Sequence, residues 1–165
     1  MTALPPAGRR SNAQIDQRLR VYSSWWVPAV FDCLDASVRL CLVEGAEPFA
    51  FRARRALSDL AGREPPVAVA LSRLTWLGCR VHPLREGNAA VLEAFDAFFQ
   101  RPDIVWVDLS GQVIELATAI RARTGLKTPD ALQAASCLQL GADHLFVTGD
   151  TAFRKVAGLN TKVLS

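Results

Sequence analysis

Hydrophobic positions along the chain follow two different spacings. Short uninterrupted apolar runs, which we interpret as buried strands, lie at residues 29–34, 67–69, 104–107 and 145–147, with a further edge strand at 161–164. Apolar residues at helical spacing indicate amphipathic helices over residues 48–62, 72–81, 88–99, 111–124 and 129–140. Strands that alternate with helices in this way predict an α/β fold, in which right-handed crossovers build a parallel sheet flanked by helices on both faces.

Three aspartates stand where these elements meet. Asp35 and Asp150 each follow a predicted strand, and Asp130 lies in the first turn of a helix that Thr128 is expected to cap. The carboxyl ends of parallel strands share one edge of the sheet, and ligands gather there, so we expect the three side chains to converge. A single aspartate at a helix start is an ordinary cap. Three converging carboxylates repel one another and are suited to bind a hard divalent cation, Mg²⁺ or Mn²⁺.

Two other architectures with acids at strand ends fit the spacing less well. A haloacid-dehalogenase-like phosphatase needs a second aspartate two residues after the first, and Ser37 occupies that position. A response-regulator receiver needs paired acids early in the chain and a lysine after a late strand. The segment Thr148-Gly149-Asp150 does not supply that lysine.

Composition sets the general class of the protein. The 165 residues are half apolar, enough for one domain with a hydrophobic core. No apolar stretch is long enough to span a membrane, and the N-terminus lacks the apolar core of a signal peptide, so we predict a soluble cytoplasmic protein without membrane contact. The four cysteines, expected to be buried small hydrophobes rather than zinc ligands or disulfide partners, are Cys33, Cys41, Cys79 and Cys137.

The net charge of +3 is concentrated at the N-terminus, where residues 1–27 hold four arginines against one aspartate. These residues are predicted to be a basic, flexible extension, either a binding arm or a frayed tail, and residues 28–165 to be the folded domain. Because the domain itself is neutral, any nucleic-acid site must come from local basic clusters. Arg73, Arg80 and Arg85 are candidates for RNA contacts, although a solvated helix face explains them equally well.

Three segments together resemble the successive motifs of PIN-domain ribonucleases, particularly VapC-type toxins. They are Leu34-Asp35-Ala36-Ser37-Val38, Lys127-Thr128-Pro129-Asp130-Ala131-Leu132 and Val147-Thr148-Gly149-Asp150-Thr151-Ala152-Phe153. The resemblance covers roughly residues 28–165 and implies a three-layer α/β/α fold with a small parallel sheet. It also implies a Mg²⁺- or Mn²⁺-dependent endoribonuclease, with tRNA as a candidate substrate, a cognate antitoxin and a homodimer. In family terms, Asp35, Asp130 and Asp150 would be the catalytic, metal-binding acids, supported by Thr148 and Ser37.

One position departs from the family pattern. PIN nucleases usually carry a fourth acid, a glutamate on the helix after the second strand, and here Gly78 occupies that position. Glycine inside a helix also costs about 1 kcal/mol relative to alanine. Two hypotheses therefore stand: a nuclease that works with three acids, or a degenerate PIN domain that binds RNA or an antitoxin without cutting. A third, a free-standing metal-binding or assembly module, has no specific feature in its favour.

Overall fold

The sheet of this protein is wholly parallel in the part of the chain that the structure describes. The computed structural model describes residues 31–35, 68–102, 104–141 and 143–164, together with a few helical residues between 51 and 58. Its strands, in the spatial order β3-β2-β1-β4-β5, are β1 (Phe31–Leu34), β2 (Ala68–Ser72), β3 (Ile104–Val107), β4 (His144–Thr148) and β5 (Thr161–Val163). Each neighbouring pair runs in parallel. The predicted parallel sheet is therefore confirmed.

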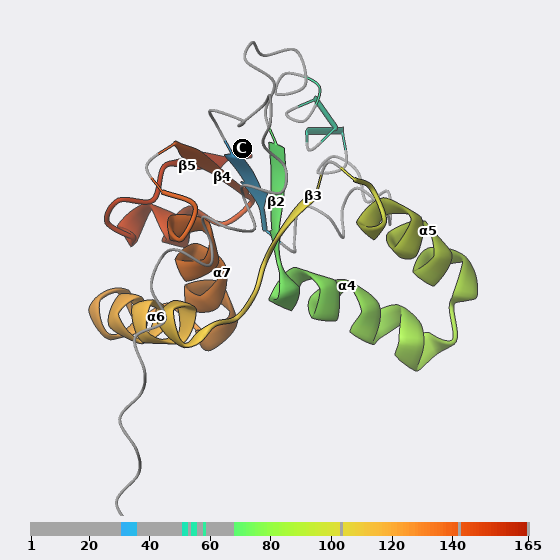
Figure 1. Ribbon diagram of the computed structural model, residues 1–165, viewed down its shortest axis with the longest axis horizontal. Coiled ribbons are helices and arrows are strands. Elements are labelled where there is room, and N and C mark those ends of the chain that lie inside the picture. Colours follow the sequence, from blue (N-terminus) through green and yellow to red (C-terminus); the bar gives the residue numbers. More distant parts are fainter. Residues whose placement is uncertain are drawn as a thin grey trace, which may run out of the picture.

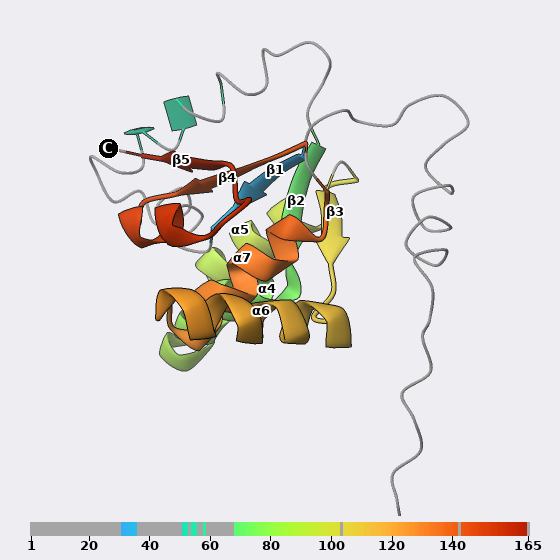
Figure 2. The ribbon, with the colours of Figure 1, turned by 90° about the vertical axis from the view of Figure 1, so that its left-hand side faces the viewer.

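Helices cover both faces of this sheet. The helices are α4 (Arg73–Glu86), α5 (Ala89–Phe99), α6 (Gly111–Thr124), α7 (Thr128–Leu138) and the 3-10 helix η1 (Thr151–Lys155). Figure 1 shows α4 and α5 on one side of the strands and α6, α7 and η1 on the other. Figure 2 shows α7 lying between the sheet and α6. The arrangement is the predicted three-layer α/β/α fold.

Successive strand residues enter two separate hydrophobic clusters, because side chains alternate between the faces of a sheet. Cys33, Ala70 and Phe146 belong to the cluster beneath α6 and α7. Their neighbours Leu34 and Leu71 belong to the cluster beneath α4 and α5. Strands buried on both faces read as continuous apolar runs, which is why the sequence predicted them well. Of the four cysteines, Cys33, Cys79 and Cys137 are buried free thiols, as predicted, and Cys41 lies outside the described residues.

The helix after β2 is longer than predicted. We expected it to end by Val81, but α4 continues through Pro83 to Glu86 and ends at Gly87, whose φ of 66° is left-handed. Proline inside a helix removes one backbone hydrogen bond. Cys79 and Pro83 are one turn apart and both buried, so their packing compensates for that loss. The predicted extension, residues 1–27, lies outside the described residues. No helix among the described residues could cross a membrane.

Replacing Phe146 by alanine should strongly destabilise the fold. Its side chain is 1% exposed in β4, and its ring centroid lies 4.7 Å from that of Phe153. The loss of packing should cost about 3–5 kcal/mol of unfolding free energy, measured by urea denaturation. Leu84→Ala, on the exposed side of α4, is the control and should change stability by no more than about 0.5 kcal/mol. Equal effects of the two substitutions would contradict the core described above.

Candidate active site

The strand register places three polar side chains in one row at the carboxyl edge of the sheet. Leu34 pairs with Val147, and the Asp35 N–H donates to the Val147 carbonyl at 3.1 Å, so the pairing continues to Asp35 and Thr148. On the other side of β1, Cys33 pairs with Ala70, which brings Ser72 beside Asp35. Residues two apart in a strand share a face of the sheet. Asp35, Ser72 and Thr148 therefore lie on the face that packs against α7, two residues further along their strands than the side chains of that core.

Thr148 links two of the predicted acids. Its hydroxyl, in a side chain with no exposed surface, donates to a carboxylate oxygen of Asp35 at 3.0 Å. The Thr148 hydroxyl oxygen in turn accepts the backbone N–H of Asp150 at 3.1 Å. Asp35 itself is buried, and the carboxylate of Asp150 accepts the N–H of Ala152 at 2.8 Å at the start of η1. The three residues thus form one hydrogen-bonded corner, joining β1 to the end of β4.

Asp130 approaches this corner from the first turn of α7. The prediction that Thr128 caps this helix was wrong, because Lys127 is the capping residue and Thr128 is already helical. The cap position has no side-chain hydrogen bond of its own, and instead the Asp130 carboxylate accepts the backbone N–H of Lys127. This bond satisfies one of the free N–H groups at the helix start.

The pKa of Asp130 is affected by both of the other acids. Burial raises this pKa most, and the negative charges of Asp35 and Asp150 raise it further. The charge of Lys127 and its backbone hydrogen bond oppose the shift but do not cancel it. The sheet edge therefore gathers all three predicted aspartates within electrostatic range of one another.

The donor set fits a hard divalent cation. Within the described ranges, no three acidic, histidine or cysteine side chains already lie close enough to form a coordination shell. The donors at this edge are all carboxylate oxygens, which suit Mg²⁺ or Mn²⁺. A bound cation would neutralise the negative charges of Asp35 and Asp150, which contribute to the raised pKa of Asp130. Ser37, the other predicted supporting residue, lies outside the described residues.

A buried polar pair, which the sequence did not predict, connects α7 to α4. The Gln133 amide donates to the Thr75 hydroxyl at 2.9 Å, and both side chains are buried. Gln133 follows Asp130 by one helical turn, and the half-buried Gly78 follows Thr75 by one turn. Gly78, where PIN nucleases usually carry a glutamate, therefore lies on α4, the helix that contacts α7. The signal in the sequence was a pair of polar residues at otherwise apolar helix positions.

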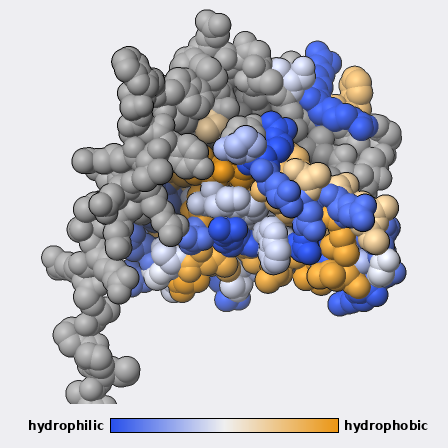
Figure 3. Space-filling model, turned by 45° about the vertical axis from the view of Figure 1, so that its right-hand side comes forward, coloured by the Kyte–Doolittle hydropathy of each residue, from blue (hydrophilic) through white to orange (hydrophobic). Residues whose placement is uncertain are grey.

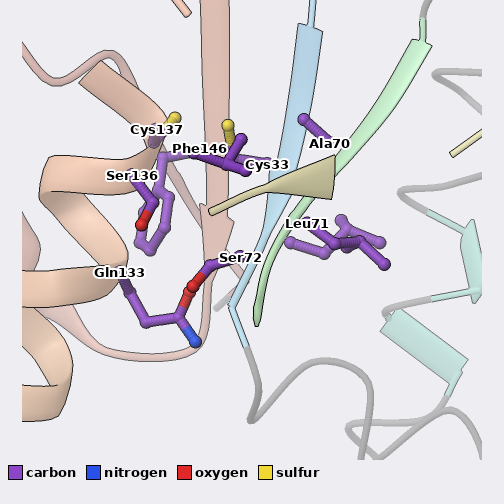
Figure 4. A pocket seen from close by; sticks show the side chains of 10 residues that line it. Cys33, Ala70, Leu71, Ser72, Gln133, Ser136, Cys137 and Phe146 are labelled. Atoms are coloured by element: carbon purple, nitrogen blue, oxygen red, sulfur yellow. The ribbon is translucent and has the colours of Figure 1, made fainter. Parts of the chain in front are cut away.

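A small cavity lies behind the row of polar side chains. Its volume is about 10 Å³, and Gln133 extends into it from α7 and Ser72 from the end of β2 (Figure 4). Ser136 also lines it, and the Ser136 hydroxyl is buried without a hydrogen-bond partner in the described structure. The space is about the size of one water molecule, and its polar lining could satisfy one.

The three arginines proposed from the sequence all lie on α4, which leads away from the acids (Figure 1). Arg73 forms an ion pair with Asp108 at 3.1 Å and lies over the ring of Trp106. Arg80 pairs with Asp96. Arg85 is exposed in the last turn of the helix. Two of the three candidates therefore belong to surface ion pairs. Figure 3 shows hydrophilic and apolar side chains interspersed on this side of the molecule.

Comparison with known proteins agrees with the α/β fold. The family model of the PIN domain matches residues 33–159, which is most of the chain, and the protein therefore belongs to the PIN domain family. No curated protein matches the sequence significantly.

Two solved structures have the same fold. One is VapBC2 from Rickettsia felis bound to a DNA fragment from its promoter, with a TM-score of 0.63, 15% identity, and coverage of 82% of this chain and 100% of that chain. The other is a toxin-antitoxin complex from Klebsiella pneumoniae, with a TM-score of 0.61, 21% identity, and coverage of 81% and 98%. At these identities the likeness establishes the fold.

Replacing Asp130 by asparagine should stabilise the metal-free protein at neutral pH. A carboxyl whose pKa is raised on folding opposes the folded state when ionised, and this penalty disappears below the unfolded pKa of about 3.9. Asparagine keeps the oxygen that accepts the Lys127 N–H but carries no charge. In EDTA, the variant should therefore have the higher Tm at pH 7, and the difference should shrink toward pH 4.

The matched control for this measurement is Asp143→Asn, an exposed aspartate in the turn before β4. Its Tm should follow that of the unmodified protein at both pH values. A lower Tm for Asp130→Asn at pH 7 would show that the three carboxylates do not repel one another as described.

Proposed function

We propose that this protein is a metal-dependent endoribonuclease of the VapC toxin type. The observation that carries the proposal is the gathering of Asp35, Asp130 and Asp150 at the carboxyl edge of the sheet, where burial, and then the charges of Asp35 and Asp150, raise the pKa of Asp130. Membership of the PIN domain family supports the same conclusion. The reaction would be hydrolysis of an RNA phosphodiester bond.

Asp35, Asp130 and Asp150 would hold Mg²⁺ or Mn²⁺, which when bound can lower the pKa of a water molecule and neutralise charge developing on a phosphate. The other residues prepare this arrangement. The Thr148 hydroxyl donates to one oxygen of Asp35 and so fixes the orientation of this carboxylate. Its link to the Asp150 backbone holds the end of β4 against β1. The positive charge of Lys127 limits the repulsion around Asp130.

The neighbouring structures, both of which are toxin-antitoxin assemblies, support an antitoxin as the proposed partner. We infer a cognate antitoxin for this chain, which would cover the acids until it is removed, and a homodimer as the functional form. The enzyme would act in the cytoplasm on RNA, and tRNA is the first substrate to test.

Gly78 supports a second candidate function, a degenerate PIN domain that binds RNA or an antitoxin without cutting. The glycine lies on α4, one turn from the Thr75–Gln133 contact with α7, where it can supply no carboxylate. Fewer acidic ligands would weaken metal binding and slow hydrolysis.

The nuclease should cut a mixed tRNA pool in the presence of Mn²⁺, and Asp130→Asn should reduce the rate by at least about 100-fold, because it removes one of only three acidic ligands. Cleavage can be followed on denaturing gels, with EDTA as the metal-free control. Expression of the unmodified chain without a partner should slow cell growth, whereas the variant should not. Absence of cleavage by both well-folded proteins would favour the degenerate domain.

Adding the missing acid should strengthen the metal site. Gly78→Glu is expected to tighten Mn²⁺ binding several-fold, measured by calorimetry, and to raise the cleavage rate. Gly78→Gln is the matched control, because it gains the same helix propensity, about 0.5–1 kcal/mol over glycine, without a charge. If both substitutions leave the Mn²⁺ affinity unchanged, position 78 does not face the metal site.

A further inference from the structure

A groove runs between α6 and α7 on the side of the sheet that carries the acids. Its volume is about 480 Å³, within the usual range for ligand sites. Apolar side chains such as Ile114 and Leu132 line it, together with Arg121 and Thr128. None of its lining residues is acidic. We call it the α6–α7 groove.

The α6–α7 groove and the proposed active site lie on opposite sides of α7, near the N-terminus of this helix. At 3.6 residues per turn, Thr128 and Leu132 are each about 160° around the helix from Asp130, so the groove is on the far side of α7. The distance from Asp130 across α7 to the groove is about one helix diameter, roughly 10 Å. Lys127 stands at the tip between them, close enough to Asp130 to affect its pKa, and its side chain is exposed. A chain leaving the acids can therefore reach the groove by passing Lys127.

The charges along this path favour a polyanion. Arg121, in the last turn of α6, is exposed, and neither its guanidinium nor the Lys127 ammonium forms an ion pair with an acid within the described part of the chain, although the Lys127 charge acts on Asp130. The arginines on the other side differ, since Arg73 and Arg80 already have carboxylate partners. Unpaired cations attract phosphates more strongly than cations whose charge is balanced by a neighbour.

We propose that the RNA strand next to the cleaved bond passes over Lys127 and lies in the α6–α7 groove. Lys127 and Arg121 contact successive phosphates, and the apolar floor of the groove lies beneath a base or a ribose. This inference rests on the proposed function for the position of the cleaved bond, but it concerns RNA binding and can be tested without cleavage.

The test measures binding of a labelled tRNA pool to the Asp130→Asn protein in Mg²⁺, by fluorescence anisotropy over a range of salt concentrations. Adding Arg121→Gln or Lys127→Gln should raise the Kd about 5- to 10-fold. Each should also reduce the slope of log Kd against log salt by about 0.7, the value for one lost phosphate contact with a single strand. Arg121→Lys should retain the slope.

Arg123→Gln is the matched control, because this exposed arginine is in the same last turn of α6 but does not line the groove. This control should change the Kd by less than 2-fold. Thr118→Glu, which places an acid in the groove wall, should weaken binding more than Thr118→Gln. Tm measurements on every variant separate these effects from loss of folding.

Failure of this inference differs from failure of the proposed function. If the unmodified protein cuts RNA but Arg121→Gln and Thr118→Glu bind it normally, the groove does not hold RNA. Equal losses for Arg121→Gln and Arg123→Gln would likewise overturn the inference, since they indicate diffuse attraction. If RNA binds with the predicted dependence on Arg121 but is never cut, the groove inference stands and the nuclease proposal fails.

Discussion

Repulsion among carboxylates at one edge of the sheet is the constraint on which the rest of this structure depends. Asp35, Asp130 and Asp150 are drawn together although their charges oppose it, and burial together with these charges raises the pKa of Asp130. The two hydrophobic clusters on either face of the sheet must supply the compensating stability. Functional sites in proteins commonly carry such local destabilisation, which the remaining structure holds in place. Here Thr148 fixes the corner by bonding to both Asp35 and the Asp150 backbone.

Much of the fold and the acidic edge could be predicted from the sequence because single strong signals govern them. The strand at 104–107 was predicted at its observed bounds, and Ser110 and Gly125 bracket α6 as expected. The end of α4 was missed because burial of Pro83 offsets an unfavourable local preference. The Thr75–Gln133 contact was missed because its partners are 58 residues apart, and local patterns carry no information about such pairs.

The arginines show a different limit of sequence reasoning. Arg73 and Arg80 looked like RNA contacts because they cluster along one helix, but folding brings Asp108 and Asp96 to them from later elements. Arg121 and Lys127 were not predicted as RNA contacts, and Lys127 was noted only as part of the motif that contains Asp130. What distinguishes Arg121 is that its guanidinium forms no ion pair with an acid among the described residues, a property that appears only when the whole surface is assembled. Charge balance is therefore a tertiary property, whereas charge itself is a sequence property.

The sheet order has a consequence for when the site can exist. Strand β4, synthesised after β1, β2 and β3, lies between β1 and the edge strand β5, and it brings Thr148 to Asp35 across 113 residues of sequence. When only β1, β2 and β3 have left the ribosome, the nascent chain can bury much of the cluster beneath α4 and α5. It still lacks Asp130 and Asp150, two of the three acids. Such long-range pairing also forms late, because closing a long loop is entropically costly. A ribosome making this protein would therefore be exposed to the complete acidic centre only after nearly the whole chain has emerged.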